Sequence, residues 1–283
     1  MNLTNYHAHS YYCDGKESLE SYVTEAVAQG FISYGFSSHS PAPFECVWFM
    51  KKEKIAQYLT EIADLKIKYE QKIQLYASLE IDFVPNQISP QDDFIKSLNL
   101  DYTIGSIHFV DAFADGKYWE IDSTQAVFVH GLQEIFNGQI AQAGKRYFEL
   151  TRQMLAEAPP TIIGHLDKFK MHNTNLALFS EQETWYKKEV LQTLEMIADL
   201  GVIVEVNTRG IYKKATFEPY PSFWILEQMQ KMNIPITVNS DAHHPREISM
   251  GFEETFKNLQ KIGFKKTKIL MDSVWIDQKI ENL

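Results

Sequence analysis

Histidine and carboxylate side chains recur at the ends of short apolar runs in this chain. His7 and His9 end the first run, His39 follows the second and Glu80 ends the third. The later members of the set, at the ends of further runs, are His108, His165, Asp241 and His243. Neutral imidazole and carboxylate are the ligands that suit Zn, Mn and Fe. Because burying many titratable groups together is costly unless they are paired or ligated, this concentration predicts a metal site.

The spacing within these motifs supports the same prediction. In extended chain, side chains two residues apart point to the same side, so His7 and His9 can reach one metal, and so can Asp241 and His243. A carboxylate such as that of Glu80 can bridge two metals, which an imidazole does poorly. A single buried histidine is more often structural, because it usually finds a hydrogen-bond partner. Six histidines at strand ends, with several carboxylates, favour ligation instead.

Three other histidines do not share this placement. His130 lies in a helical stretch, His172 in the loop MHNTN, and His244 directly after His243. We expect them to lie at the surface or beside the substrate rather than to bind metal.

Strand and helix patterns alternate along the chain, which is typical of parallel βαβ units. Strands are expected at 3–7, 32–36, 73–81, 102–108, 161–165, 202–206, 236–239 and 267–271. Helices are expected at 19–29, 51–70, 124–157 with a break near Gly138, 181–200, 221–232 and 247–262. About seven repeats favour a closed barrel, although the pattern alone also allows a doubly wound sheet. In both folds the chemistry gathers at the carboxyl ends of the strands.

Size and charge limit the classes of function. The 283 residues contain no linker, repeat or low-complexity segment, so we expect a single domain, 1–283. The net charge of −10 argues against binding to nucleic acid or to an anionic membrane. The negative net charge does not exclude an anionic small-molecule substrate, because bound cations can reverse the local electric field.

The lack of a targeting signal and the small number of cysteines predict a cytoplasmic protein. The first ten residues lack the basic and apolar regions of a signal peptide, and no run is long enough to span a membrane. Cys13 and Cys46 are too few for a disulfide framework, so we expect two reduced thiols. The sequence leaves the oligomeric state open.

The motifs together resemble a known family. YHAHSYYCDG, SSHSP, LEID, GSIHF, GHLD and NSDAH are similar to the motifs of the polymerase-and-histidinol-phosphatase (PHP) phosphoesterases. The similarity runs from His7 to His243, most of the chain. It implies an α/β fold of the distorted (β/α)7, TIM-like barrel type and a centre of three divalent metals, whose identity among Zn, Mn and Fe stays open.

The resemblance also implies how the ligands divide among the three metals. The first metal would be held by His7, His9, Glu80 and Asp241. The second would be held by Glu80, His108 and His165. The third would be held by Asp14, His39 and His243. Two positions depart from the commoner family pattern: Asp14 stands where some relatives have His, and Ser38 stands where Asp is more usual. An Asp at the position of Ser38 would orient the neighbouring histidine, a contact that is here lost or replaced by water.

Within the family, GSIHFVDAF, GHLDKFK and EVNTRG look most like the histidinol-phosphatase branch. This implies hydrolysis of L-histidinol phosphate to L-histidinol and phosphate, in histidine biosynthesis. Another PHP phosphoesterase, acting on a different small phosphate ester, is the alternative. A metal-dependent amidohydrolase is less favoured, because no strand end offers its usual bridging lysine. A non-catalytic metal protein or a DNA-processing module is less favoured still.

The expected reaction assigns roles to individual residues. Water made acidic by the metals attacks phosphorus, and Glu80 is the shared carboxylate. Asp241 or His243 is expected to pass a proton to the leaving group. Arg209 and Lys168 are the candidates for binding phosphate, and their alternative role is a solvated surface charge. Candidates of lower rank are Arg146 and Lys117.

Two further expectations concern the surroundings of the site. Glu205 lies deeper on the strand that precedes Arg209, where it could hold that arginine in place. The rings of Phe44, Trp48 and Phe49 could cover the imidazole of the substrate, and core packing is an equal alternative.

Overall fold

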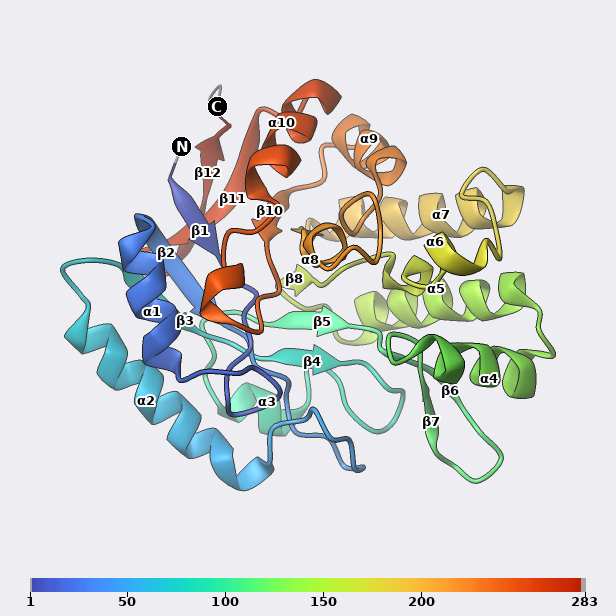
Figure 1. Cartoon of the computed structure of the whole chain (residues 1–283), viewed down its shortest axis with the longest axis horizontal. Coiled ribbons are helices and arrows are strands. Elements are labelled where there is room, and N and C mark those ends of the chain that lie inside the picture. The colour runs from blue at the N-terminus through green and yellow to red at the C-terminus, as the bar shows by residue number, and fades with distance from the viewer. Residues whose placement is uncertain (1, 281–283) are drawn as a thin grey trace.

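Parallel strands surrounded by helices make up the computed structural model of the chain (Figure 1). The structure describes residues 2–280, with the backbone alone for Leu176; residues 1 and 281–283 of the expected domain lie outside it. The strands are β1 (Leu3–Asn5), β2 (Phe31–Phe36), β3 (Gln74–Ala77), β4 (Glu80–Asp82), β5 (Ile104–Ser106), β6 (Phe109–Ala112), β7 (Tyr118–Glu120), β8 (Ile162–Ile163), β9 (Ile203–Asn207), β10 (Ile236–Asn239), β11 (Lys266–Met271) and β12 (Val274–Lys279). The helices are α1 (Leu19–Ala28), α2 (Ile55–Lys68), α3 (Asp93–Ser97), α4 (Gln125–Phe136), α5 (Ile140–Glu157), α6 (Asn173–Leu176), α7 (Thr184–Leu200), α8 (Arg209–Tyr212), α9 (Phe223–Lys231) and α10 (Phe252–Ile262).

Two parallel sheets carry the fold. The first has the order β1-β2-β3 and the second the order β10-β9-β8-β5-β4. Beyond the named strands, single parallel bridges join Ala8 to Ala242 and His39 to Glu80, so the two sheets touch at both sides. The chain therefore has an α/β fold with parallel sheets, as its sequence pattern predicts.

The strand expected at 73–81 is the main correction to the predicted elements. It is two strands, β3 and β4, because β3 pairs with β2 whereas β4 pairs with β5. Between them the backbone N–H of Glu80 donates to the carbonyls of Ser37 and Ser38, at 3.2 and 3.1 Å. The chain thus moves from one sheet to the other just before Glu80.

The helices cover the outside of the sheets with their apolar sides inward (Figure 1). In α2 the predicted helical spacing is confirmed, since Ile55, Ile62 and Leu65 are buried. The expected break near Gly138 is also confirmed, because α4 ends at Phe136 and α5 begins at Ile140. No helix within residues 2–280 is both long enough and apolar enough to cross a membrane.

Two antiparallel hairpins, β6–β7 and β11–β12, are absent from the predicted pattern. The β6–β7 hairpin leaves the carboxyl end of β5 and returns to the same side of the molecule. The β11–β12 hairpin is tied to the first strand: the hydroxyl of Tyr6 accepts from the backbone N–H of Leu270 at 2.7 Å. The side-chain amide of Gln278 donates to the carbonyl of Asn2 at 2.9 Å.

Candidate metal centre and its pocket

The nine predicted metal ligands lie together where the parallel strands end. His7 and His9 follow β1, His39 follows β2 and Glu80 begins β4. The others follow β5, β8 and β10 or lie in the loop before α1: His108, His165, Asp241, His243 and Asp14. Seven of the nine are buried, and only Asp14 and His243 are partly exposed. The strand-end placement of these residues in the sequence therefore predicts their meeting in space.

The carboxylate of Glu80 lies at the centre of this cluster. Its Oε2 is 3.1 Å from His39 Nδ1 and 3.2 Å from His7 Nε2. Its Oε1 is 2.9 Å from His165 Nε2 and 3.6 Å from His108 Nε2. The two oxygens thus face different sets of imidazoles, which is the arrangement expected of a carboxylate shared by two cations.

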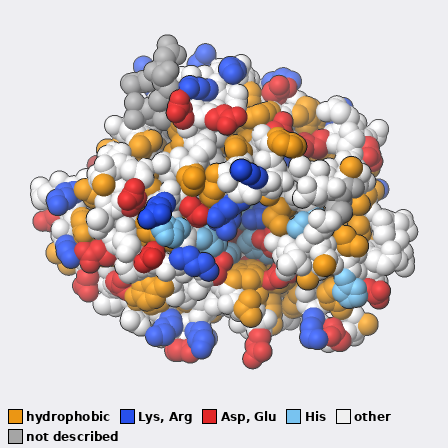
Figure 2. All heavy atoms as spheres, in the orientation of Figure 1, with side chains coloured by type: hydrophobic (Ala, Val, Ile, Leu, Met, Phe, Trp, Pro, Cys, Tyr) orange, Lys and Arg blue, Asp and Glu red, His pale blue; other side chains and the backbone are white. Residues whose placement is uncertain are grey.

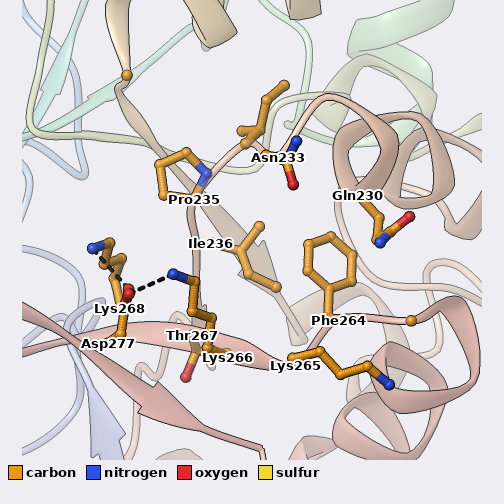
Figure 3. A pocket seen from close by; sticks show the side chains of 13 residues that line it. Gln230, Asn233, Pro235, Ile236, Phe264, Lys265, Lys266, Thr267, Lys268 and Asp277 are labelled. Carbon is orange, nitrogen blue, oxygen red and sulfur yellow. Dashed lines mark hydrogen bonds and ion pairs between the residues drawn. The ribbon is translucent and has the colours of Figure 1, made fainter.

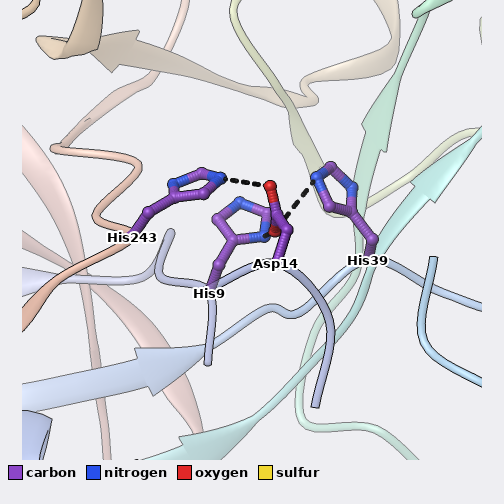
Figure 4. A group of neighbouring side chains, drawn as sticks. All are labelled: His9, Asp14, His39 and His243. Atoms are coloured by element: carbon purple, nitrogen blue, oxygen red, sulfur yellow. Dashed lines mark ion pairs between the residues drawn. The ribbon is translucent and has the colours of Figure 1, made fainter. Parts of the chain in front are cut away.

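A second group of ligand atoms surrounds Asp14 (Figure 4). Asp14 Oδ2 is 3.0 Å from His243 Nε2, and Oδ1 is 3.7 Å from His9 Nδ1 and 4.0 Å from His39 Nε2. His9 also faces Asp241, with its Nε2 3.2 Å from Oδ1. The expected grouping of Asp14, His39 and His243 therefore agrees with the geometry, but His9 lies between this group and the one that contains His7.

Several ligand atoms of the cluster lack a well-aligned hydrogen bond. His7 Nε2, His9 Nε2, His39 Nδ1 and Asp14 Oδ1 are buried and make no well-aligned hydrogen bond among the described residues, although carboxylate oxygens lie close to the three nitrogens. A buried polar atom without a partner costs about 1–3 kcal/mol, so four in one place require an explanation. A divalent cation is the partner that suits imidazole nitrogens and carboxylate oxygens at once. The residues present therefore fit the metals that the motifs imply.

The electrostatics of the cluster agree with this fit. Burial and the neighbouring His243 lower the pKa of His9 to about 4. Burial and His9 lower the pKa of His39 to about 4. Burial would raise the pKa of Glu80, but the positive charge of His7 holds it well below its usual value. At neutral pH His9 and His39 are thus neutral and Glu80 is ionised, the protonation states that metal ligands need. His7 and His108 differ: although burial opposes it, Glu205 raises the pKa of His7 and Asp82 raises that of His108 to about 10, so these two imidazoles would lose a proton when a metal binds.

Two buried carboxylates orient the ligating histidines from behind. Glu205 Oε2 is 2.5 Å from His7 Nδ1, and its Oε1 accepts from the backbone N–H of His165 at 3.2 Å. Asp82 Oδ1 is 3.0 Å from His108 Nδ1. Such contacts fix the tautomer and direct the other ring nitrogen toward a metal. Glu205 therefore holds His7 and not, as expected, Arg209, because Arg209 begins α8 beyond the end of β9.

Ser38, the second departure from the family pattern, is also explained by its contacts. Its hydroxyl is 3.0 Å from that of Ser10, and both residues are fully buried. A pair of hydroxyls thus stands where the resemblance predicts a carboxylate.

A pocket of about 470 Å³ opens above the cluster. Figure 2 shows histidine side chains in a hollow of this face, with Lys and Arg side chains beside it. Both predicted phosphate-binding cations line the pocket, together with Lys213. Lys168 Nζ lies 3.5 Å from Asp122 Oδ2, and Arg209 Nη1 donates to the carbonyl of Asp241 at 2.8 Å.

The lower-ranked cations lie elsewhere, and that part of the prediction is wrong. Lys117 is exposed in the β6–β7 turn, 2.9 Å from Asp115. Arg146 lies on α5, 3.9 Å from Glu149. Neither lines the pocket.

Of the three aromatic residues expected near the substrate, Trp48 lines the pocket. Phe44 and Phe49 instead pack on Phe109, with ring centroids 5.3 and 6.0 Å away. Two of the remaining histidines lie at the surface as expected: His130 stacks on Phe113, and His244 caps a short turn. His172 does not, because it is buried and contacts the carbonyl of Ser123.

A second cavity, of about 490 Å³, lies at the opposite ends of the strands (Figure 3). It is bordered by Pro235, just before β10, and by β11. Lys266 and Lys268 both pair there with Asp277, at 2.5 and 2.8 Å. Its lining contains none of the clustered ligands, so the metal chemistry belongs to the first pocket.

Comparison with known proteins agrees with the motifs. The sequence profile of the PHP domain matches residues 5–209. The chain belongs to the PHP family. Among PHP-like relatives, a protein of Deinococcus radiodurans named probable histidinol-phosphatase is 25% identical over 264 residues, 92% of this chain and 94% of that protein. The histidinol-phosphatase of Bacillus subtilis is 24% identical over 271 residues, 89% of this chain and 98% of that one.

A solved structure shares the fold. The histidinol phosphate phosphatase of Lactococcus lactis, complexed with zinc, L-histidinol and phosphate, superposes with a TM-score of 0.74 at 21% identity. The match covers 96% of this chain and 98% of that one. The α/β architecture of this PHP-family chain is thus that of the solved phosphatase.

Proposed function

We propose that this chain is a histidinol-phosphatase, a metal-dependent phosphomonoesterase that hydrolyses L-histidinol phosphate to L-histidinol and phosphate in histidine biosynthesis. One observation carries the proposal: nine imidazole and carboxylate side chains cluster at one place, and seven of them line a pocket that Lys168, Arg209 and Lys213 also line. The clustered imidazoles and carboxylates suit metals, and the three cationic side chains beside them suit an anion. Relatives named histidinol-phosphatase, similar over about nine-tenths of the chain, support the choice of substrate.

We further propose one domain over residues 1–283, folded as a distorted (β/α)7 barrel. The bridges Ala8–Ala242 and His39–Glu80 support closure, because they join the two parallel sheets on both sides. The large apolar cluster that runs from Ala8 to Phe264 supports a single domain. The free thiols of Cys13 and Cys46 are compatible with the cytoplasm as the proposed location.

Three divalent ions of Zn, Mn or Fe are the proposed cofactors. His7, His9, Glu80 and Asp241 would hold the first, Glu80, His108 and His165 the second, and Asp14, His39 and His243 the third. The chemistry that such cations supply is Lewis acidity, which lowers the pKa of a nearby water and offsets charge on the phosphate.

The chain's own residues would perform the remaining steps. Arg209 and Lys168 bind phosphate oxygens and orient the ester for in-line attack by water. As the water oxygen bonds to phosphorus, the bond from phosphorus to the alcohol oxygen breaks. Asp241 or His243 takes up the proton that the attacking water loses and passes it to the departing alkoxide, and the alcohol and phosphate then leave. The hydrogen bond from Arg209 to the carbonyl of Asp241 couples the phosphate-binding and proton-transfer groups.

A substrate panel tests this function. Metal-loaded protein should hydrolyse L-histidinol phosphate with a kcat/KM well above those for p-nitrophenyl phosphate, a sugar phosphate and a nucleotide, since specificity is a ratio of these values. Faster turnover of the sugar phosphate or the nucleotide would assign the chain to another PHP activity.

A further inference from the structure

Besides seven of the nine candidate ligands, five charged side chains line the pocket: Lys168, Arg209, Lys213, Glu120 and Asp122. The three cations suit a phosphate. The two carboxylates do not, because like charges repel and the repulsion grows as water is excluded. Glu120 and Asp122 therefore require an explanation other than phosphate binding.

The β6–β7 hairpin brings both carboxylates to the pocket. Glu120 is the last residue of β7, and Asp122 follows two residues later. Both carboxylates line the pocket, whereas Ile121, in the turn between them, is fully buried in the core. The hairpin thus presents two negative charges to one wall of the pocket.

Each carboxylate has part of its bonding capacity left for a ligand. Glu120 accepts through Oε1 from Trp48 Nε1 and from the thiol of Cys46. Asp122 contacts Lys168 Nζ and His108 Nε2 through Oδ2, at 3.5 and 3.7 Å. The closest contacts of each carboxylate thus run through a single oxygen, and an ionised carboxyl group accepts at both.

The indole of Trp48 forms an aromatic wall beside these carboxylates. Its ring centroid lies 4.3 Å from that of His39, and the ring is nearly parallel to Phe109, at 9°. The hydrogen bond to Glu120 holds the indole in place. A flat aromatic face next to two negative charges suits an aromatic or heteroaromatic cation.

We propose that Glu120 and Asp122 select phosphate esters of cationic alcohols. They bind the positive amine, or the protonated heterocycle, of the alcohol part while the phosphate lies against the metal cluster and Arg209. The inference rests on the proposed function, since L-histidinol carries both a primary amine and an imidazole. Without these carboxylates the basic rim would repel such an alcohol.

Isosteric variants test the two carboxylates. Glu120→Gln and Asp122→Asn are each assayed, metal-loaded, with L-histidinol phosphate and with 3-phenylpropyl phosphate, whose alcohol part is uncharged. The ratio of the two kcat/KM values should fall about tenfold or more, because a hydrogen bond to a charged group contributes about 1.5–3 kcal/mol. A third ester, 3-(imidazol-4-yl)propyl phosphate, lacks the amine and shows which carboxylate meets the amine and which the ring.

Asp111→Asn is the matched control. Asp111 lies on the same hairpin but is exposed, 4.0 Å from Arg146 and outside the pocket, so its loss should leave the ratio unchanged. Calorimetric titration of L-histidinol into metal-loaded protein is a second measurement, independent of turnover. Its Kd should rise in Glu120→Gln and Asp122→Asn but not in the control.

Three results would overturn the inference. The first is an unchanged ratio with an unchanged Kd for L-histidinol in both variants. The second is loss of metal from Asp122→Asn in elemental analysis, which would make Asp122 a ligand. The third result concerns a wild type that does not hydrolyse L-histidinol phosphate. That failure alone rejects the proposed function but not the inference. The ratio for 3-aminopropyl phosphate over propyl phosphate then decides, and a wild-type ratio near one rejects selection of cationic alcohols.

Discussion

Replacing Glu205 with glutamine should lower the affinity for metal, although Glu205 is not itself one of the proposed ligands. The fully buried carboxylate faces donors on both sides. Oε2 accepts from His7 Nδ1 and from Asn239 Nδ2, at 2.5 and 3.0 Å. Oε1 accepts from the backbone N–H of His165 and from Asn207 Nδ2, at 3.2 and 2.5 Å. Glutamine has the same shape, but one of its two terminal atoms is an NH₂ group, which cannot accept.

The size of the effect follows from these four contacts. In one orientation the new NH₂ faces Asn239 and Nδ1 of His7, and in the other it faces Asn207 and the backbone N–H of His165. Two buried donors then lose their acceptor, at about 1–3 kcal/mol each. If His7 instead accepts from the amide, its proton moves to Nε2, the nitrogen that faces Glu80. Changes to residues that orient metal ligands typically cost about 10–100-fold in metal affinity or activity.

The assay combines kcat/KM for L-histidinol phosphate, metal content after dialysis and thermal unfolding. We expect Glu205→Gln to lose about 10–100-fold in kcat/KM, to retain less metal and to unfold at a lower temperature. Glu189→Gln is the control: Glu189 is also a buried carboxylate, 2.7 Å from Arg152, but it lies on α7 away from the pocket. It should lose stability and keep its metal. Wild-type kcat/KM and metal content in Glu205→Gln would refute the reasoning.

Four further results are expected. Glu80→Ala should lose metal and turnover together in a chain that circular dichroism shows to be folded; near-normal turnover would remove its shared role. Excess EDTA should abolish turnover and lower the unfolding temperature, and added Zn or Mn should restore both, unless the cluster binds no metal. Arg209→Ala should raise KM at constant metal content, with partial recovery in Arg209→Lys; unaltered kinetics would make Arg209 structural. Gly35→Ala should destabilise the protein in thermal unfolding by about 1–3 kcal/mol, because its new Cβ would lie 2.1 Å from the hydroxyl of Tyr102; an unchanged unfolding temperature would contradict this.

The sequence predicts the repeating part of the fold well and its irregular parts poorly. The long helices and most parallel strands follow from apolar spacing, which local side-chain pattern records. The division of 73–81 into β3 and β4 does not, because it depends on which neighbour each half pairs with. The β6–β7 hairpin did leave a signal: Asp115 and Gly116 form a turn dipeptide between two short runs with alternating apolar residues.

Site residues were predictable where the strand itself fixes their direction. His7 and His9 meet as their period of two predicts, and the other strand-end ligands join them. Glu205 shows the limit of this reasoning. Glu205 and Arg209 would face the same side only if the chain stayed extended between them. The chain instead enters α8 at Arg209. Glu120 and Asp122 were missed as pocket residues because they lie on a hairpin outside the βα repeat.

The hydrogen bond from Gln278 to Asn2 brings the two ends of the described chain to one place on the molecule, near the N and C labels of Figure 1. That place is the start of β1, whereas His7 and His9 lie beyond its other end. An affinity tag or a linker to a solid support, attached at either terminus, would therefore leave from the side away from the pocket. Immobilised protein prepared through either end should keep its pocket open to the surrounding solution.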